Sequence, residues 1–266
     1  MPEANTKITN RIVAVCGKGG TGKTAFTAMV TKVLLESGRA GKLLLIDADP
    51  AMGLPLALGV RVKRTLGQIR EEIIQTARGG KEAEKHQVVD KLDYMLFEAL
   101  HEMDNYALLA MGRTETLGCF CPINSVLKQA IQTLSKSFDT IIIDGEAGLE
   151  QLNRQVAGHI DTLIIVSDAT SRGIQTAAQV KDMILNEKVI QCDRLGLVFN
   201  RVSDNIELLQ QAAGNLGIEV LGYVPQDQSV AYNDLIGEPI LELGDSPALD
   251  AVSDIVKSKI FPERYR

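Results

Sequence analysis

The sequence has few aromatic residues and no tryptophan, and phenylalanine and tyrosine together make up only 4% of its 266 residues. Proteins that bind single-stranded nucleic acid stack the bases on aromatic side chains, and proteins that bind the phosphate backbone present many lysines and arginines. Here the formal net charge is −6. We therefore expect no nucleic-acid partner.

Long apolar segments are also missing. The longest apolar runs, such as residues 43–46 and 163–166, have the length of strands, whereas a helix that spans a bilayer needs about 20 apolar residues. Residues 1–10 are polar and lack the apolar segment of a secretory signal. We expect a soluble, cytoplasmic protein with no membrane partner, in which a polar extension over residues 1–10 precedes a single domain over residues 11–266.

The four cysteines are too few for a disulfide framework, but two of them, Cys119 and Cys121, lie close together. In a reducing compartment such a pair more often indicates metal or redox chemistry, and the alternative is ordinary packing. In an extended segment residues i and i+2 point to the same side, so both sulfurs can face one ion. We expect Cys16 to be a small buried hydrophobe and Cys192 to lie in an exposed turn.

Two thiolates do not complete a metal site, because zinc takes four ligands in structural sites and nickel is often square-planar. A two-fold dimer supplies a second pair from the same motif of the other subunit. Cys119 and Cys121 are therefore candidate ligands of Ni²⁺ or Zn²⁺ that would be shared across a dimer.

Residues 17–24 read Gly-Lys-Gly-Gly-Thr-Gly-Lys-Thr and fit the pattern G-x-x-x-x-G-K-[ST] of a phosphate-binding loop. An apolar run at residues 11–16 predicts a strand before the loop, and the pattern of residues 25–37 predicts a helix after it. In this setting Lys23 reaches the β- and γ-phosphates and the Thr24 hydroxyl binds Mg²⁺. The residues expected to bind the nucleotide here are Gly17, Gly19, Gly20, Thr21, Gly22, Lys23 and Thr24.

The loop has a second lysine, Lys18, which an ordinary phosphate-binding loop does not need. Lys18 is either a solvated charge or a group that reaches phosphate bound to another subunit. The sequence pattern alone leaves both interpretations open.

Three acids come at or just after the ends of apolar runs. Asp47 and Asp49 follow residues 42–46, and Asp144 ends residues 138–144. The carboxyl ends of parallel strands face the crevice in which α/β sheets bind ligands. We expect Asp144 to hold the water shell of Mg²⁺, and Asp47 and Asp49 to position the metal or orient the attacking water. Helix capping is the alternative for Asp49.

Apolar runs alternate with helical patterns along the whole chain, which predicts an α/β fold with a doubly wound, mainly parallel sheet and helices on both faces. Residues 78–91 are charged and are interpreted as a surface excursion, and residues 92–103 favour a helix. A final helix is expected to begin with Ser246 as N-cap, followed by Pro247, and to end near residue 260.

Together the two-lysine loop, Asp47-Ala48-Asp49-Pro50 and Asp144 with Ala147-Gly148 resemble the deviant-Walker dimeric ATPases, which include MinD, ParA, the nitrogenase iron protein and metal-insertion ATPases. The resemblance implies ATP-dependent dimerisation in which Lys18 of one subunit touches phosphate bound to the other. It also implies that Asp49 activates water for Mg²⁺-dependent hydrolysis of ATP to ADP, with Lys18 and Lys23 as the other catalytic residues.

The same resemblance implies where the base of the nucleotide binds. Asn200 is expected to hydrogen-bond adenine, and residues 225–227, with Pro225 and Asp227, are expected to border it. Thr114 and Arg201 are also expected to contact the nucleotide.

A Gly-Arg segment at residues 112–113 leads to Gly118-Cys119-Phe120-Cys121, which is similar to the CooC-type and AcsF-type nickel-insertion ATPases. The resemblance implies a metallochaperone whose client is carbon monoxide dehydrogenase or acetyl-CoA synthase. Two alternatives stay open. One is a MinD/ParA-like positioning ATPase, although core packing explains the apolar stripe of residues 255–261 better than membrane binding does. The other is an iron–sulfur electron donor, from which the C-x-C spacing departs.

Overall fold

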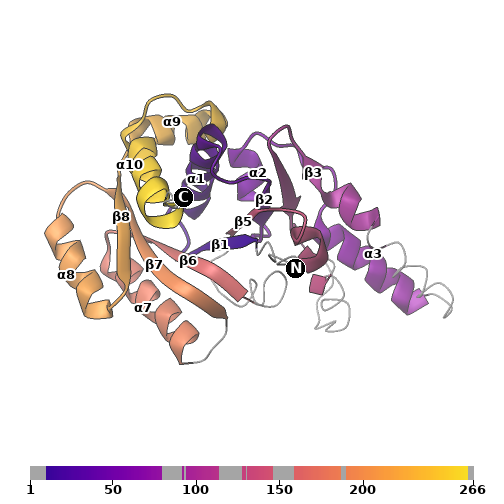
Figure 1. Cartoon of the computed structure of the whole chain (residues 1–266), viewed down its shortest axis with the longest axis horizontal. Helices are drawn as coiled ribbons and strands as arrows, with labels where there is room; N and C mark the ends of the chain where they lie inside the picture. Colours follow the sequence, from indigo (N-terminus) through magenta and orange to yellow (C-terminus); the bar gives the residue numbers. More distant parts are fainter. Residues whose placement is uncertain are drawn as a thin grey trace, which may run out of the picture.

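The computed structural model describes residues 10–79, 92, 94–113, 128–129, 131–145, 159–186 and 190–262, and for residues 77–79 it describes only the backbone. Within these ranges an eight-stranded sheet has the order β3-β4-β2-β5-β1-β6-β7-β8 (Figure 1). Its strands are β1 (Arg11–Cys16), β2 (Leu43–Asp47), β3 (His101–Glu102), β4 (Tyr106–Ala110), β5 (Thr140–Asp144), β6 (His159–Asp168), β7 (Gln191–Val202) and β8 (Glu219–Pro225).

The strands are parallel except for β3, which pairs antiparallel with β4 at one edge of the sheet. This confirms the predicted doubly wound, mainly parallel α/β class. The register aligns Asp144 of β5 with Asp47 of β2 on one side and with Val15 of β1 on the other. The acids and the phosphate-binding loop therefore lie at the same end of the parallel strands, the carboxyl end.

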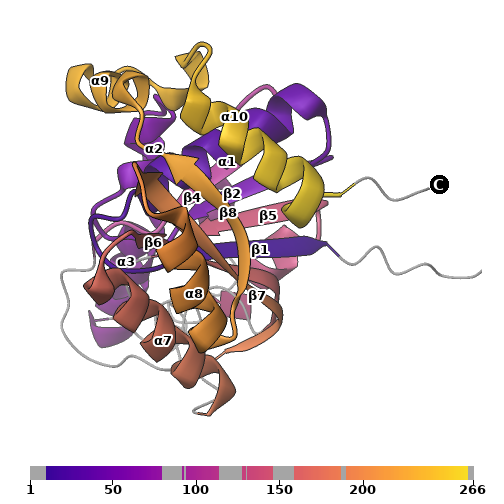
Figure 2. The ribbon, with the colours of Figure 1, turned by 90° about the vertical axis from the view of Figure 1, so that its left-hand side faces the viewer.

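Side chains of the central strands alternate between two hydrophobic cores, one on each face of the sheet, which explains why these strands are apolar without interruption. In β2, Leu43 and Leu45 belong to one core and Leu44 and Ile46 to the other. Figure 2 shows the helices in two layers on either side of the sheet. The first layer holds α1 (Lys23–Ser37), α2 (Gly53–Ala57), α9 (Gln228–Ile236) and α10 (Pro247–Ile255), and the second holds α3 (Leu66–Gly79), α7 (Ser171–Leu185) and α8 (Ile206–Leu216).

The C-terminal helix begins as predicted. The Ser246 hydroxyl accepts a hydrogen bond from the Leu249 N–H at 3.2 Å, and Pro247 occupies the first turn. Its last turn is π-helical over Val256–Ile260. The apolar stripe at this end is buried in the core beside α1, which confirms that it serves packing; its members are Ile255, Val256, Ile260 and Phe261.

Three expectations about local structure need correction. Residues 94–99 are helical as predicted, but residues 101–102 form β3 because they pair with β4. Residues 78–79 belong to α3 and not to a surface excursion. Cys192 is half-buried in β7, which begins four residues earlier than its apolar run at residues 195–199. Pairing with β6 extends β7 into a polar stretch that has no strand pattern of its own.

The Ser246 cap gives a stability prediction. We expect Ser246→Ala to lower the free energy of unfolding by at least about 1 kcal/mol, because the Leu249 N–H loses its acceptor and Oδ2 of Asp227 loses a donor. Urea denaturation followed by circular dichroism measures this change. Ser258→Ala, near the exposed end of the same segment, is the control, and it should change the free energy by less than about 0.5 kcal/mol. Equal losses in both variants would show that Ser246 does not act as a cap.

Candidate functional site

The predicted phosphate-binding loop connects β1 to α1 and has the backbone that phosphate binding requires. Gly17 and Gly22 have φ angles of 138° and 82°, in the region that favours glycine. A Cβ atom on Gly17 would lie 2.2 Å from the Val166 carbonyl oxygen, and one on Gly22 would lie 2.5 Å from Nδ2 of Asn200. The loop thus packs tightly against the ends of β6 and β7.

The N-terminus of α1 has the features of an anion-binding site. Its N-cap is Gly22, which offers no side-chain acceptor, and the first turn contains no acid. The first N–H groups of the helix and its positive dipole end are therefore left for a phosphate group. Lys23 is buried, and its ammonium group donates to the Lys18 carbonyl oxygen at 3.2 Å, across the inside of the loop. The loop and the Lys23 ammonium group therefore lie together, and their binding of phosphate stays a prediction.

Asp144 is buried directly beneath the loop helix and is held by two hydroxyl groups. Thr24 Oγ1 donates to Asp144 Oδ2 at 2.7 Å, and Thr27 Oγ1 lies 3.0 Å from Oδ1. Burial raises the pKa of Asp144 to about 6, although the hydrogen bonds from Thr24 and Thr27 and the charge of Lys23 lower it. The structure therefore brings the predicted Mg²⁺ residues Thr24 and Asp144 together.

Asp47 is fully buried next to Asp144. Its two carboxylate oxygens accept the backbone N–H groups of Asp49 and Leu54 at 2.9 and 3.0 Å. Burial raises the pKa of Asp47 to about 7, and the nearby charge of Asp144 adds to the increase. Two buried carboxyls beside a threonine hydroxyl are a donor set of hard oxygens, which fits Mg²⁺ and the water molecules that it retains.

Asp49 lies in the turn after β2, half-buried, and its Oδ1 accepts the Ala51 N–H at 2.8 Å. The side chain therefore takes part in a local turn, close to the alternative that the sequence left open. Its other oxygen makes no hydrogen bond to the described part of the chain. Asp49 follows β2 at the same end of the strands as Asp47 and the loop, and its catalytic role stays a prediction.

Lys18 forms an ion pair that the sequence analysis missed. Its ammonium group lies 3.4 Å from Oδ2 of Asp168, the last residue of β6, and the two side chains are 36% and 26% exposed. Thr170 Oγ1 donates to the other oxygen of Asp168 at 2.5 Å. Partial burial raises the pKa of Asp168, but the hydrogen bonds from Thr170 and Lys18 outweigh it and the net pKa is lowered.

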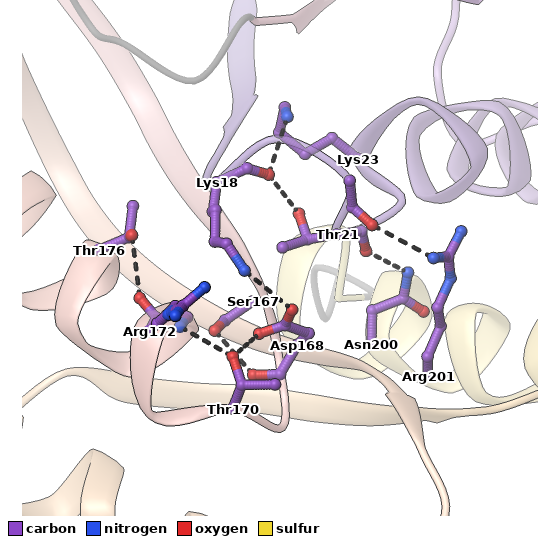
Figure 3. Close-up of polar contacts among 12 residues, drawn as sticks. Lys18, Thr21, Lys23, Ser167, Asp168, Thr170, Arg172, Thr176, Asn200 and Arg201 are labelled. Carbon is purple, nitrogen blue, oxygen red and sulfur yellow. Dashed lines mark hydrogen bonds and ion pairs between the residues drawn. The ribbon is translucent and has the colours of Figure 1, made fainter.

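Figure 3 shows that the two lysines of the loop point in different directions, Lys23 inward across the loop and Lys18 outward toward Asp168 and Thr170. A signal for Asp168 was present in the sequence. Like Asp47 and Asp144, it is an acid shortly after an apolar run, here residues 163–166, and β6 begins before this run and ends after it.

The residues expected to surround adenine also come together. A cavity of about 320 Å³ lies between α1, the ends of β7 and β8, α9 and the start of α10. Asn200, Arg201, Pro225 and Asp227 all line it, together with Gln226 of the expected segment 225–227. The sequence analysis did not anticipate the remaining lining residues, which are Ala25, Met29, Val230, Ala231, Asp234 and Ala248. Helix α9 was not predicted, so its contribution to the cavity could not be foreseen.

Two of the predicted residues connect this cavity to the phosphate loop. Asn200 Nδ2 donates to the Thr21 carbonyl oxygen at 2.8 Å, and Nη1 of Arg201 donates to the Gly20 carbonyl oxygen at 3.2 Å (Figure 3). Arg201 has a φ angle of 57°, which is uncommon for a residue with a side chain. The end of β7 thus holds the loop in place as well as forming one wall of the cavity.

Asp227 uses its carboxylate to connect two helices. Oδ1 accepts the Ser229 N–H at 2.8 Å at the start of α9, and Oδ2 accepts the Ser246 hydroxyl at 2.6 Å and the Ala248 N–H at 3.1 Å. Partial burial raises the pKa of Asp227, but these hydrogen bonds lower it overall. Asp227 therefore positions the cavity wall.

Several predicted residues lie outside the described part of the chain, namely Thr114, Cys119 and Cys121. The structure therefore does not test the paired-cysteine site. Cys16 is fully buried in the core, as predicted, and burial raises its pKa to about 12. Its thiol is thus neutral and acts as a small hydrophobic group.

The fold and the site define a doubly wound α/β nucleotide-binding protein with a phosphate-binding loop. Residues 12–240 match the family described as the CobQ/CobB/MinD/ParA nucleotide binding domain. The chain belongs to this family, and the comparisons confirm the resemblance to the deviant-Walker ATPases.

Two relatives illustrate the range of the family. The chain is 37% identical to an uncharacterized ATP-binding protein of Methanocaldococcus jannaschii, over 96% of this chain and 100% of that protein. It is 28% identical to the carbon monoxide dehydrogenase accessory protein CooC of Rhodospirillum rubrum, over 89% of this chain and 90% of CooC.

Among solved structures, the ParA family ATPase of Chlorobium tepidum has a TM-score of 0.67 at 20% identity, with coverage of 94% of this chain and 99% of that chain. The MinD protein of Pyrococcus horikoshii, solved with Mg-ADP, has a TM-score of 0.65 at 23% identity, with coverage of 93% and 94%. These similarities confirm the fold. None of the helices in the described ranges is long and apolar enough to cross a bilayer.

The raised pKa values of Asp47 and Asp144 predict that the protein without nucleotide loses stability as pH rises from about 4 to about 7. A carboxyl whose pKa is higher in the folded state stabilises that state at low pH, and the contribution disappears as pH passes about 6 for Asp144 and about 7 for Asp47. Each group contributes at most about 1.4 kcal/mol per pH unit. Urea denaturation at several pH values measures the slope.

The control for this experiment is a pair of variants. Asp144→Asn should have a shallower decline with pH than the wild type, because it removes one titrating group. Asp204→Asn, which changes an exposed acid, should keep the slope of the wild type. Identical slopes in all three proteins would show that the buried pair does not titrate in this range.

Proposed function

We propose that this chain is a Mg²⁺-dependent ATPase that works as a dimeric metallochaperone and inserts nickel into carbon monoxide dehydrogenase or acetyl-CoA synthase during maturation. The observation that carries the proposal is the match to CooC along about nine-tenths of both chains, in a protein that also has the Cys119-x-Cys121 pair. Membership of a nucleotide-binding family supports the ATPase part.

The geometry of the loop supports ATP and Mg²⁺ as its ligands. The N-terminus of α1 and Lys23 would bind the β- and γ-phosphates, and Thr24 would exchange its hydrogen bond to Asp144 for a bond to Mg²⁺. Asp144 and Asp47 would hold the water molecules of the ion, and Asp49 would orient the attacking water. The cavity beside Asn200 and α9 has room for the base. The solved MinD structure with Mg-ADP agrees with this choice of ligands.

The outward direction of Lys18 supports a dimer that forms upon ATP binding. Lys23 already serves the inside of the loop, whereas Lys18 lies at the surface and binds Asp168 of its own subunit. To reach phosphate in a second subunit, Lys18 must leave Asp168. The ion pair would therefore disfavour the dimer until the phosphate of a partner replaces the carboxylate as the anion beside Lys18.

Dimer formation would bring Cys119 and Cys121 of two subunits together as four ligands for Ni²⁺ or Zn²⁺, and hydrolysis of ATP would release the subunits during delivery. The energy is sufficient, because a ligand at 100 times its dissociation constant that binds only one state stabilises that state by about 2.7 kcal/mol. The nucleotide would then decide when the metal site is complete.

The metal part is tested with anaerobically purified protein by measuring nickel binding and dimerisation with ADP and with ATP. We expect one Ni²⁺ ion per dimer whose binding requires ATP, and we expect Cys119→Ser/Cys121→Ser to lose this nucleotide-dependent ion because all four thiolates disappear. Cys192→Ser is the matched control and should bind as the wild type does.

A double variant that retains the nucleotide-dependent nickel ion, at one per dimer, would disprove the assignment of the site. Iron and labile sulfide in the anaerobic protein would instead identify the iron–sulfur electron donor.

The Lys18–Asp168 ion pair predicts a variant that dimerises more readily. Asp168→Asn should lower the dimer dissociation constant with Mg-ATP by roughly two- to thirtyfold, because each dimer no longer breaks two exposed ion pairs. Lys18→Ala should abolish the ATP-dependent dimer, and Asp204→Asn should leave it unchanged. Analytical ultracentrifugation measures all four proteins, and an unchanged constant in Asp168→Asn would show that the ion pair does not restrain dimerisation.

A positioning ATPase is the second candidate, because the chain is also 26% identical to MinD of Bacillus subtilis over 86% of this chain and 81% of MinD. The burial of Ile255, Val256, Ile260 and Phe261 leaves no apolar stripe at residues 255–261 for insertion into a membrane. Co-sedimentation with liposomes or DNA in the presence of ATP tests this candidate. Strong binding at physiological salt would favour it over the metallochaperone.

A further inference from the structure

We propose that His159, Asp161 and Asp193 form a second metal site, for a divalent transition ion such as Zn²⁺, Ni²⁺ or Co²⁺. The three residues lie at the amino ends of β6 and β7, at the opposite end of these strands from the nucleotide site. This inference does not depend on the proposed function, because it uses neither the phosphate loop nor the Cys119–Cys121 pair.

The pairing of the two strands brings the three side chains together. β6 and β7 are parallel, and the register aligns His159 with Gln191 and Thr162 with Arg194, so that Asp161 lies beside Asp193. In a strand, residues i and i+2 point to the same face. His159 and Asp161 therefore share a face of β6 with Asp193 on the neighbouring strand. One ligand atom from each residue lies within 4.8 Å of the other two.

The distances suit coordination. Nε2 of His159 lies 3.1 Å from Oδ2 of Asp193. Two donors that each bind an ion at about 2.1 Å are separated by about 3.4 Å at the tetrahedral angle and by about 3.0 Å at the right angle of an octahedral site, and the observed distance lies between these values. The side chains of His159 and Asp193 are 51% and 66% exposed, so they can move the small distance that a third bond to Asp161 requires. Water would complete the coordination shell.

Asp161 is held in position by the backbone. Its Oδ2 accepts the Ile12 N–H of β1 at 2.6 Å, and the residue is half-buried. Oδ1 makes no hydrogen bond to any described residue and is left for an ion. A ligand that is oriented by a second hydrogen bond has less freedom to lose upon binding, as in the outer shells of known metal sites. Asp161 would thus be the rigid member of the site.

The donor set selects a class of ion. Imidazole suits zinc, nickel and related ions, carboxylates add negative charge, and the absence of a thiolate from the set disfavours Cu⁺. Two carboxylates and a neutral imidazole would neutralise a divalent ion. The nine steps along β6 from His159 to Asp168 correspond to about 30 Å, so this site is separate from the nucleotide site.

The experiment uses the full chain with Cys119→Ser/Cys121→Ser, without nucleotide, so that binding at the cysteine pair does not contribute. Isothermal titration with Zn²⁺ and with Ni²⁺ should find one ion per chain. Adding His159→Gln or Asp193→Asn should weaken binding by at least about tenfold, because even the loss of an outer-shell partner typically costs that much.

Two further substitutions in the same background are matched controls. His101→Gln changes an imidazole whose nitrogens contact the backbone of Lys63 and Ala99, and Asp204→Asn changes an exposed acid. Both should bind as the parent does. With Co²⁺, the parent should show visible absorption bands that are lost in His159→Gln, which reports the loss of the nitrogen ligand directly.

Circular dichroism establishes that each variant is folded, and ATP affinity should be the same in all of them because the nucleotide site is distant. If the parent takes up no stoichiometric ion, or if His159→Gln and Asp193→Asn bind as tightly as the controls, the proposed site is wrong. That result would leave the metallochaperone proposal intact, because the cysteine pair is absent from every protein in the comparison.

Discussion

The hydrogen bond from Thr24 to Asp144 connects the phosphate-binding loop to the centre of the sheet. Asp144 is buried beside Asp47, and placing two carboxyls in such an environment is unfavourable unless they are protonated or paired. The hydroxyls of Thr24 and Thr27 and the backbone N–H groups at Asp49 and Leu54 offset only part of this cost. The cost that remains is the reason why the pKa values of both carboxyls are raised.

At the carboxyl ends of the strands, the two lysines of the loop point in different directions. Lys23 is buried and directed across the loop, and Lys18 is directed outward to Asp168. β7 supports the loop through Asn200 and Arg201, and Asp227 holds the helices that enclose the neighbouring cavity. The loop, the neighbouring cavity and the outward Lys18 thus all lie at the carboxyl ends of β1, β6, β7 and β8.

The parts that sequence patterns predicted are local in origin. The glycine spacing of residues 17–24 has few structural uses, and uninterrupted apolar strands occur mainly in sheets covered on both faces. Asp144 was found because it directly ends such a strand. Asp168 was missed because polar positions extend β6 beyond its apolar run, and β3 was missed because it exists only through its pairing with β4.

By itself, the sequence determined the α/β class, the phosphate-binding loop and the acids that accompany it, since each depends on residues that are near one another in the chain. Only the tertiary structure decided what lies beside Lys18, how α9 encloses the cavity, and that His159 and Asp161 meet Asp193. The reason is that strand register and helix packing bring together residues separated by tens to more than a hundred positions, and no local pattern encodes those distances.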